Sequence, residues 1–317
     1  MLPGRVLNFV DFLFRRVRER DEPFGGCQVI ATGDFLQLPP VRTDTRPYDW
    51  AFLSDAWQGA DFKTIMLETV HRQDDPEFVR ALADFRVGRV CGRSARLLQE
   101  RIRNFPPANL TRLFTHNAQV DKWNRFQLDG LPSEPVVLEA EVEGPELQVD
   151  FLKRSMLTPT TLVLKVGALV MFTINRNAKG RVERGEYTPG PVLHVNGQLG
   201  VVEAFGTSAS GKVDAVMVRT EEGKLITATH FIWSYDRKDP ECGKVRQFPL
   251  RLAYAMTIHK SQGLTLDAAY LDIRAAREPG QAYVAVSRVR TLAGLNFKAW
   301  FKGVHVSPEA IEFYARN

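Results

Sequence analysis

The pattern of apolar and polar positions predicts helices and strands that alternate along most of the chain. Residues 5–20 (RVLNFVDFLFRRVRER) place apolar side chains at helical spacing, which indicates an amphipathic helix. Further helices are predicted at Asp75–Val87, Asn117–Gln127, Pro279–Val289 and Pro308–Arg316. Strands are predicted at Gln28–Ala31, Lys63–Leu67, Ala268–Ile273 and Leu295–Phe301, and at the residues that end at Thr115; Leu162–Phe172 is a mostly apolar run that Gly167 interrupts. This alternation favours an α/β fold whose parallel sheet binds ligands at its carboxyl edge.

Residues 176–248 have a different pattern. Short β-type runs at Gly200–Phe205, Val213–Arg219 and Leu225–His230 are separated by glycine and serine turns. This spacing predicts a small β-barrel that is inserted into the α/β body.

Length and composition narrow the class of protein. The chain has 317 residues, 44% of them hydrophobic and 25% charged, which is typical of a soluble globular protein of two domains and a smaller third. No apolar run is long enough to cross a membrane, and no signal-peptide pattern begins the sequence. Cys27, Cys91 and Cys242 are widely spaced and odd in number, which argues against a disulfide scaffold or a cysteine zinc site. We therefore expect an intracellular protein, in the cytoplasm or nucleoid, or in the nucleus or mitochondrion of a eukaryote.

The charge is compatible with a nucleic-acid partner without requiring one. The formal net charge is +5. Arginines cluster at two places, which are either solvated helix faces or phosphate-binding surfaces: Arg15, Arg16, Arg18 and Arg20, and Arg101, Arg103 and Arg112.

The segment Leu252–Asp267 (LAYAMTIHKSQGLTLD) carries the most informative chemistry. Its apolar part ends at a polar cluster of His259, Lys260, Ser261 and Gln262, and Gly263 follows. These side chains can all hydrogen-bond phosphate oxygens, and a glycine lets the backbone approach a ligand closely. The alternative is a polar turn between a helix and a strand.

Two further segments favour a phosphate-binding role for this cluster over a polar turn. Gly33–Val41 reads GDFLQLPPV, and Gly280–Arg290 reads GQAYVAVSRVR. Together with TIHKSQG they resemble signature motifs of superfamily 1B DNA helicases, above all the petite-integration-frequency (PIF-type) family, which is related to RecD. The resemblance runs from about residue 27 to residue 297 and is weaker between 176 and 248.

The resemblance implies a particular domain organisation. Residues 1–64 would be the remainder of a first, incomplete RecA-like domain. Residues 65–175 and 249–317 would form a second RecA-like domain, and residues 176–248 an inserted SH3-like β-barrel.

The resemblance also assigns a nucleotide site. Gln37 would contact the γ-phosphate of ATP, and Arg72 and Arg288 would be arginine fingers that neutralise charge during phosphoryl transfer. Gln262 and Gly263 would line the nucleotide side of the cleft. The alternatives are a turn glutamine for Gln37 and surface ion pairs for the two arginines.

A DNA site is implied beside it, with single-stranded DNA as the partner. The main candidates are Thr257, His259 and Lys260, since hydroxyl groups and cations can hold a phosphate backbone without reading bases. The other candidates are Thr115, Asn117, Gln281, Tyr283 and Arg290. His259 could instead be structural, and Tyr283 could belong to the core.

The parts that hold ATP itself are not found in the sequence. Gly206–Val213 resembles a phosphate loop but ends in valine, and a strand pattern follows it, which predicts a hairpin. Asp21–Glu22 is the only Asp-Glu pair, and its surroundings predict a solvated turn. We therefore expect ATP and Mg²⁺ to be held mainly by residues outside this chain. The chain itself is expected to contain no metal site.

Three explanations remain open: a fragment, one part of a split helicase that pairs with a separate chain carrying the N-terminal RecA-like half, or a non-catalytic remnant. The chain is thus expected to be part of an ATP-dependent 5′–3′ DNA helicase that does not hydrolyse ATP alone. The alternative is a non-catalytic module that binds single-stranded DNA or a protein partner.

Overall fold

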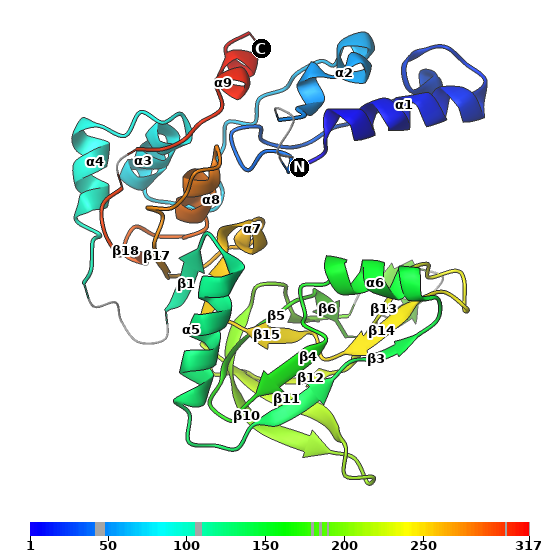
Figure 1. Cartoon of the computed structure of the whole chain (residues 1–317), viewed down its shortest axis with the longest axis vertical. Coiled ribbons are helices and arrows are strands. Elements are labelled where there is room, and N and C mark those ends of the chain that lie inside the picture. The colour runs from blue at the N-terminus through cyan, green and yellow to red at the C-terminus, as the bar shows by residue number, and fades with distance from the viewer. Residues whose placement is uncertain are drawn as a thin grey trace. The chain divides into compact units, whose positions relative to one another are not determined.

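The computed structural model describes residues 1–41, 48–104, 110–178, 181–183, 186–188, 190–301 and 303–316 (Figure 1). The chain forms two compact units, one of residues 1–105 and 267–317, the other of residues 106–266. These boundaries differ from the domain boundaries expected from the sequence, which stay a prediction.

The first unit combines helices with a parallel strand pair. Strands β17 (Ala269–Leu271) and β18 (Leu295–Phe297) run in parallel, with Ala269 opposite Leu295. Helix α8 (Gln281–Ser287) lies between them in the sequence, as a parallel crossover requires. The other helices described here are α1 (Gly4–Arg18), α2 (Asp55–Ala60), α3 (Pro76–Arg86), α4 (Gly92–Gln99) and α9 (Pro308–Arg316), with 3-10 turns at Pro23–Gly26 and Ala51–Leu53.

Helix α3 forms where the sequence predicts it, because its ends are specified locally. The Asp75 carboxylate accepts hydrogen bonds from the backbone N–H of Glu77 (2.9 Å) and of Phe78 (3.4 Å), which satisfies donors at the helix start. Gly88, with φ of +75°, follows the helix end. Phe78 and Phe85 on one face are fully buried.

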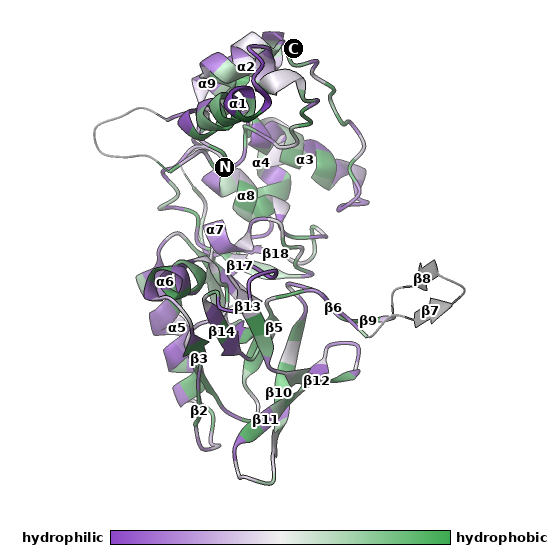
Figure 2. Cartoon of the chain, turned by 90° about the vertical axis from the view of Figure 1, so that its right-hand side faces the viewer, coloured by the Kyte–Doolittle hydropathy of each residue, from purple (hydrophilic) through white to green (hydrophobic). Residues whose placement is uncertain are grey.

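Helix α1 is amphipathic, as predicted, but much of its apolar surface is exposed. Only Gly4 and Leu7 of the helix are buried. The side chains of Phe9, Phe12 and Val17 are 58%, 60% and 81% exposed. Apolar and polar residues are both visible along the helix in Figure 2.

The two buried strands predicted before residue 70 are not present. Residues 28–31 and 63–67 contain no strand, and the side chains of Ile30 and Leu67 are 81% and 91% exposed. A strand requires a hydrogen-bonded neighbour, and within the described part of the chain neither segment pairs with one.

The second unit also contains a parallel strand pair. Strands β1 (Thr111–Phe114) and β16 (Ala255–Thr257) run side by side, with Phe114 opposite Thr257. Helix α5 (Asn117–Asp129) packs against both strands, and α7 (Ile258–Ser261) follows β16 directly. The polar residues after β1 and β16 therefore lie at the same carboxyl edge.

The rest of this unit is largely antiparallel β-structure. A five-stranded sheet has the order β12-β11-β10-β5-β15, and a three-stranded sheet has the order β13-β14-β3. Their strands are β3 (Glu141–Glu143), β5 (Leu169–Phe172), β10 (Leu199–Thr207), β11 (Val213–Thr220), β12 (Leu225–Thr229), β13 (Phe231–Ser234), β14 (Lys244–Gln247) and β15 (Leu250–Leu252). The remaining elements are α6 (Glu146–Ser155) and the strand pairs β2 (Val136–Glu139) with β4 (Thr161–Leu164), β6 (Arg176–Asn177) with β9 (Val192–His194), and β7 (Arg181–Glu183) with β8 (Glu186–Thr188).

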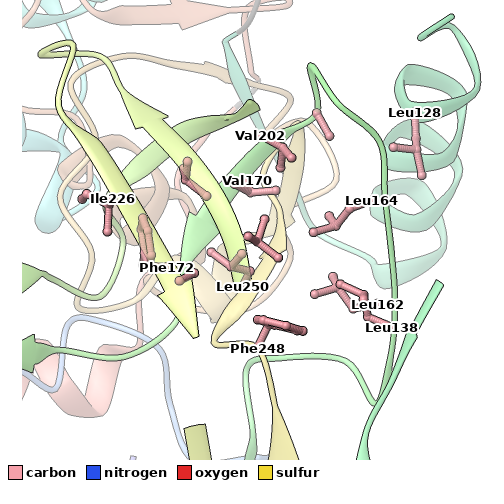
Figure 3. Packing of buried hydrophobic residues seen from close by; sticks show 14 residues of the cluster. Leu128, Leu138, Leu162, Leu164, Val170, Phe172, Val202, Ile226, Phe248 and Leu250 are labelled. Carbon is pink, nitrogen blue, oxygen red and sulfur yellow. The ribbon is translucent and has the colours of Figure 1, made fainter. Parts of the chain in front are cut away.

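An apolar cluster fills the space among β2, β4, the five-stranded sheet and α5 (Figure 3), and a second, smaller cluster lies between α6 and β14. Val170, Phe172 and Leu250 are each less than 1% exposed and point into the larger cluster. Alternate residues of β5 and β15 therefore face this core, and the residues between them face the other side of the sheet.

The prediction that residues 176–248 are rich in β-strands is confirmed. The segment Gly206–Val213, which resembles a phosphate loop, forms a hairpin as predicted. Within Gly206–Val213, which joins β10 to β11, the N–H of Ser208 donates to the carbonyl of Lys212 at 2.8 Å. The α/β class with parallel strands is confirmed as well. Among the described helices, none has the length and apolar character needed to cross a bilayer.

His194 introduces a pH-sensitive position into the second unit. Its ring stacks on Phe172 with centroids 4.2 Å apart, and its Nδ1 donates to the Ile174 carbonyl at 3.0 Å. Its Nε2 is buried and has no hydrogen-bond partner among the described residues. Burial, helped by the charge of Arg176, lowers the pKa of His194, and the hydrogen bond to Ile174 opposes this.

We expect the free energy of unfolding to fall as the pH drops below 6.5, the ordinary histidine pKa. The unfolded chain then binds a proton that the folded chain excludes, a loss of at most about 1.4 kcal/mol per pH unit. His194→Asn keeps a donor to Ile174 but cannot titrate. Urea denaturation near pH 7 and in mild acid should show a smaller pH-dependent loss for this variant than for wild type. His305→Asn, at an exposed position, is the control; equal losses in all three proteins would contradict the expectation.

Candidate nucleotide and DNA sites

The loop that carries Gln37 is fixed by the side chain of Asp34. The carboxylate accepts hydrogen bonds from Nη2 of Arg86 on α3 (2.8 Å), the N–H of Leu36 (3.0 Å), the hydroxyl of Tyr314 on α9 (3.2 Å) and Nε2 of Gln37 (3.4 Å). The hydroxyl of Tyr314 also accepts from the N–H of the residue after Asp34 at 3.0 Å. The loop is therefore held by two helices, and one face of the Gln37 amide is directed towards Asp34.

The charge of Asp34 is stabilised although the group is mostly buried. Burial alone would raise the pKa of its carboxyl group. The hydrogen bonds and charge of Arg86, helped by Leu36 and Gln37, outweigh burial and hold this pKa below its usual value. Arg86 in turn lies over the ring of Tyr314, 4.9 Å from its centroid.

Helix α8 begins in direct contact with the same loop. Gly280, immediately before the helix, has φ of +70°. A Cβ atom at this position would lie 2.3 Å from the carbonyl oxygen of Gln37 and 2.5 Å from that of Leu36. Both the backbone conformation and the close approach require glycine, so the first residue of GQAYVAVSR sets the distance between α8 and the loop.

The end of α8 gathers the candidate arginines. Nη1 of Arg72 donates to the carbonyl of Ser287 at 3.0 Å, and Nη2 of Arg288 donates to the hydroxyl of the same serine at 3.0 Å. Nε2 of Gln73, which is buried, donates to the carbonyls of Ser287 (3.2 Å) and Val289 (2.9 Å) and so satisfies acceptors at the helix end. Sequence reasoning missed the role of Gln73, which follows Arg72 directly.

The two guanidinium groups are close enough to repel each other. Burial, followed by the charge of Arg72, lowers the pKa of Arg288 to about 10. Arg288 is only 3% exposed, and its Nε donates to the carbonyl of Val284 at 3.0 Å. Two cations held in this way favour an anion beside them.

Tyr283 lies within electrostatic range of both Asp34 in the loop and the two candidate arginines. Burial raises the pKa of its hydroxyl group, and the charge of Asp34 adds to the effect, whereas Arg86, Arg288 and Arg72 oppose it. All four charges therefore lie within electrostatic range of one side chain. The structure thus surrounds Tyr283, a candidate for DNA contact, with the candidate nucleotide residues.

The other DNA candidates of this unit differ in exposure. Gln281 is 4% exposed at the start of α8. Arg290 is exposed and forms an ion pair with Asp267, with 3.4 Å between Nη1 and Oδ1. Their roles stay predictions.

In the second unit, the candidates lie at the shared carboxyl edge of β1 and β16. Buried Thr257 caps α7, because its hydroxyl accepts from the N–H of Lys260 at 3.3 Å. The side chains of His259, Lys260 and Gln262 are exposed, and exposed Gly263 has φ of +84°. Three members of the polar cluster therefore face solvent, whereas Ser261 is buried and its hydroxyl donates to the carbonyl of Ile258 at 2.8 Å.

Thr115 and Asn117 lie at the same edge. Thr115 follows β1, and its hydroxyl hydrogen-bonds Nδ1 of His116 at 2.7 Å, while Asn117 is exposed at the start of α5. Because Phe114 is opposite Thr257, the structure places both candidates beside the start of α7. Asn124 holds this arrangement, since its amide both donates to (3.1 Å) and accepts from (2.8 Å) the backbone of Ala255.

The parallel strand pairs and mixed α/β content fit a RecA-like α/β protein, whose candidate site combines a glutamine loop with two arginines, one of them buried. Residues 1–86 match the family model for PIF1-like helicases. The chain is 36% identical to the ATP-dependent DNA helicase Pif1 of Bdellovibrio bacteriovorus, over 99% of this chain and 68% of that protein. It is 34% identical to the human ATP-dependent DNA helicase PIF1, over 99% of this chain and 47% of that protein. The chain belongs to the PIF1-like helicase family.

Solved structures agree with this assignment. The unliganded Pif1 of a Bacteroides species has a TM-score of 0.80 and 30% identity, and the match covers 99% of this chain and 73% of that one. The Pif1 helicase of Candida albicans has a TM-score of 0.77 and 30% identity, and the match covers 100% of this chain and 74% of that one. The chain thus spans about half to three quarters of the length of these relatives.

We expect Asp34→Asn to lower the free energy of unfolding by about 2 kcal/mol, because Arg86 would keep its charge without a partner in a site that is mostly shielded from water. Asp34's contribution is complete above pH 3.8, its ordinary pKa, and is lost at lower pH as the carboxylate takes up a proton. Urea denaturation at neutral pH measures the change.

The matched control is Glu312→Gln on α9, which removes an ion pair with Arg316 whose side chains are 62% and 73% exposed. An exposed pair contributes less than about 1 kcal/mol. Equal losses for the two variants would show that Asp34 does not hold the loop.

Proposed function

We propose that this chain is part of an ATP-dependent 5′–3′ DNA helicase that couples ATP hydrolysis to movement along single-stranded DNA. Curated relatives are named ATP-dependent DNA helicases. A Pif1 helicase of Bacteroides, similar to this chain with a TM-score of 0.67 and 30% identity, has been solved in complex with ADP-AlF3 and single-stranded DNA. An intracellular compartment that contains DNA follows from this proposal.

The observation that carries the proposal is the convergence of Arg72 and Arg288 on Ser287, at the end of α8, whose start contacts the loop of Gln37. Guanidinium groups that repel each other, one buried and one half-buried, are stabilised when negative charge is placed between them. In the proposed role Gln37 contacts the γ-phosphate or the attacking water, and the two arginines neutralise the charge that develops during transfer.

The DNA side of the proposal is the carboxyl edge of β1 and β16. Thr257, His259 and Lys260 would contact the phosphate backbone, with Thr115 and Asn117 as further contacts. Gln262 and Gly263, directly after them, would line the nucleotide side. A single short segment would then transmit a change at the nucleotide to the DNA.

The groups that hold ATP and Mg²⁺ are proposed to lie mainly outside these 317 residues. Within the described ranges, no three His, Cys, Asp or Glu side chains are grouped so that they could hold a metal ion. A separate chain, or a longer form of this one, would supply the phosphate loop and the magnesium carboxylates. The proposed domains are residues 1–64, residues 65–175 with 249–317, and an SH3-like barrel of residues 176–248.

The proposal is tested by co-expression with the part of the Bdellovibrio bacteriovorus relative that the match does not cover. We expect hydrolysis of ATP that is stimulated by single-stranded DNA. Arg288→Ala should lower kcat about a thousandfold, the usual effect of losing an arginine finger. Arg277→Ala, at an exposed position outside the site, should not.

Full activity of Arg288→Ala would exclude the assigned role. If the complex does not hydrolyse ATP although the chain binds single-stranded DNA, the alternative of a non-catalytic binding module would be correct.

A further inference from the structure

Arg251 is a buried cation in the middle of β15. It lies opposite Met171 of β5, and its neighbours Leu250 and Leu252 pack in or against the apolar cluster of Figure 3. Because successive side chains of a strand point to opposite faces, Arg251 leaves the sheet on the face away from that core. Its side chain is nonetheless removed from water, since the residue is only 8% exposed.

Two of the three guanidinium nitrogens of Arg251 are not satisfied by the described part of the protein. Nε and Nη1 of Arg251 are both buried, and within the described part of the chain neither atom has a hydrogen-bond partner. Almost all buried donors in proteins are paired, and a buried charge without hydrogen bonds destabilises the fold. Packing therefore does not explain an arginine here, since an apolar side chain of similar length would suit the position better.

The charged residues that influence Arg251 lie near the carboxyl edge of β1 and β16, the candidate DNA site. Burial, followed by the charge of Arg251, lowers the pKa of Lys260, and the carboxylate of Asp121 opposes this effect. Burial also lowers the pKa of Arg251, again with Asp121 opposing. Arg251, Lys260 on α7 and Asp121 on α5 therefore lie within electrostatic range of one another, and the residues Lys260 and Asp121 are exposed.

We propose that Arg251 and Lys260 together bind one backbone phosphate of single-stranded DNA, with Arg251 as the inner cation of the site. This inference rests on the proposed function, because it adds a residue to the DNA edge of β16 and α7. A phosphate placed beside the exposed ammonium group of Lys260 would lie over two cations that otherwise repel each other.

Binding would use donors that are already free of other bonds. Nε and Nη1 of Arg251 break no hydrogen bond when they turn towards a phosphate, and a guanidinium group can donate to two phosphate oxygens at once. Asp121 partly balances the two cations when DNA is absent and repels the phosphate when it arrives. Contacts of this kind read no bases, which suits a protein that moves along DNA of any sequence.

The test is the affinity of the full chain for a fluorescent oligo-dT strand, measured by anisotropy over a series of salt concentrations. We expect Arg251→Met to weaken binding roughly tenfold, the effect of losing one charge-assisted hydrogen bond. The slope of log K against log salt should also fall by about 0.7, the value for one phosphate contact on a single strand. Arg251→Lys should keep most of the slope.

The control for net charge is Arg219→Met, which removes an exposed arginine from β11, paired with Glu203. It should leave both affinity and slope close to wild type. Asp121→Asn should tighten binding, because it removes the carboxylate that repels the phosphate.

Thermal unfolding separates this role from a structural one. Arg251→Met should raise Tm by roughly 2–4 °C, because a buried, unsatisfied charge is replaced by an apolar side chain. A variant that is less stable, or that fails to fold, would show that Arg251 supports the fold and would overturn the inference.

The failure of this inference can be distinguished from failure of the proposed function. If wild type binds the strand and Arg251→Met matches Arg219→Met in affinity and slope, the inference alone is wrong. If wild type does not bind single-stranded DNA, both the proposed function and the phosphate site are wrong.

Discussion

The Asp34 carboxylate joins segments that are far apart in the chain, and the candidate nucleotide site depends on it. Its partners Arg86 and Tyr314 are 52 and 280 positions away; Arg86 donates to both carboxylate oxygens and Tyr314 to Oδ1, while Gln37 donates to Oδ2. Gly280 then brings α8 against the backbone of this loop, so the arginines at the far end of α8 have a fixed relation to Gln37. An ion pair and a residue without a side chain thus set the geometry of the site.

The sequence predicted those parts of the structure whose causes are local. Helix α3 was predicted because Asp75 caps it and Gly88 follows it, and Gly206–Val213 was predicted to be a hairpin because no helix pattern follows. In contrast, residues 28–31 have the composition of a buried strand, but composition cannot supply the neighbouring strand that hydrogen bonding requires. Closure of the predicted barrel likewise depends on which strands pair with each other, and the composition of residues 176–248 does not determine that pairing.

The residues of the candidate site also divide into those that the sequence predicted and those that it missed. Gln37, Arg72 and Arg288 were proposed through a resemblance in their motifs, and their roles stay predictions. Arg86 and Arg251 were missed because each looks like an ordinary charged residue in the sequence. What distinguishes them is burial and the partners that burial gives or denies them.

Buried guanidinium groups occur in both units, and the surroundings of both are unfavourable for a positive charge. Arg288 is next to another cation, and Arg251 has donors without partners. Proteins usually tolerate such groups where binding compensates for the lost stability. The least favourable electrostatic positions of this chain are therefore the best guide to where negative charge would bind.

Helix α1 has a consequence for how this protein behaves in solution. Phe9, Phe12 and Val17 expose large apolar side chains on a helix of 15 residues. Exposed apolar surface of this kind favours self-association as concentration rises, because contact between two molecules removes it from water. We expect the colloidal behaviour of the purified chain to be governed by this helix, and polar substitutions at these three positions to keep it monodisperse without touching either site.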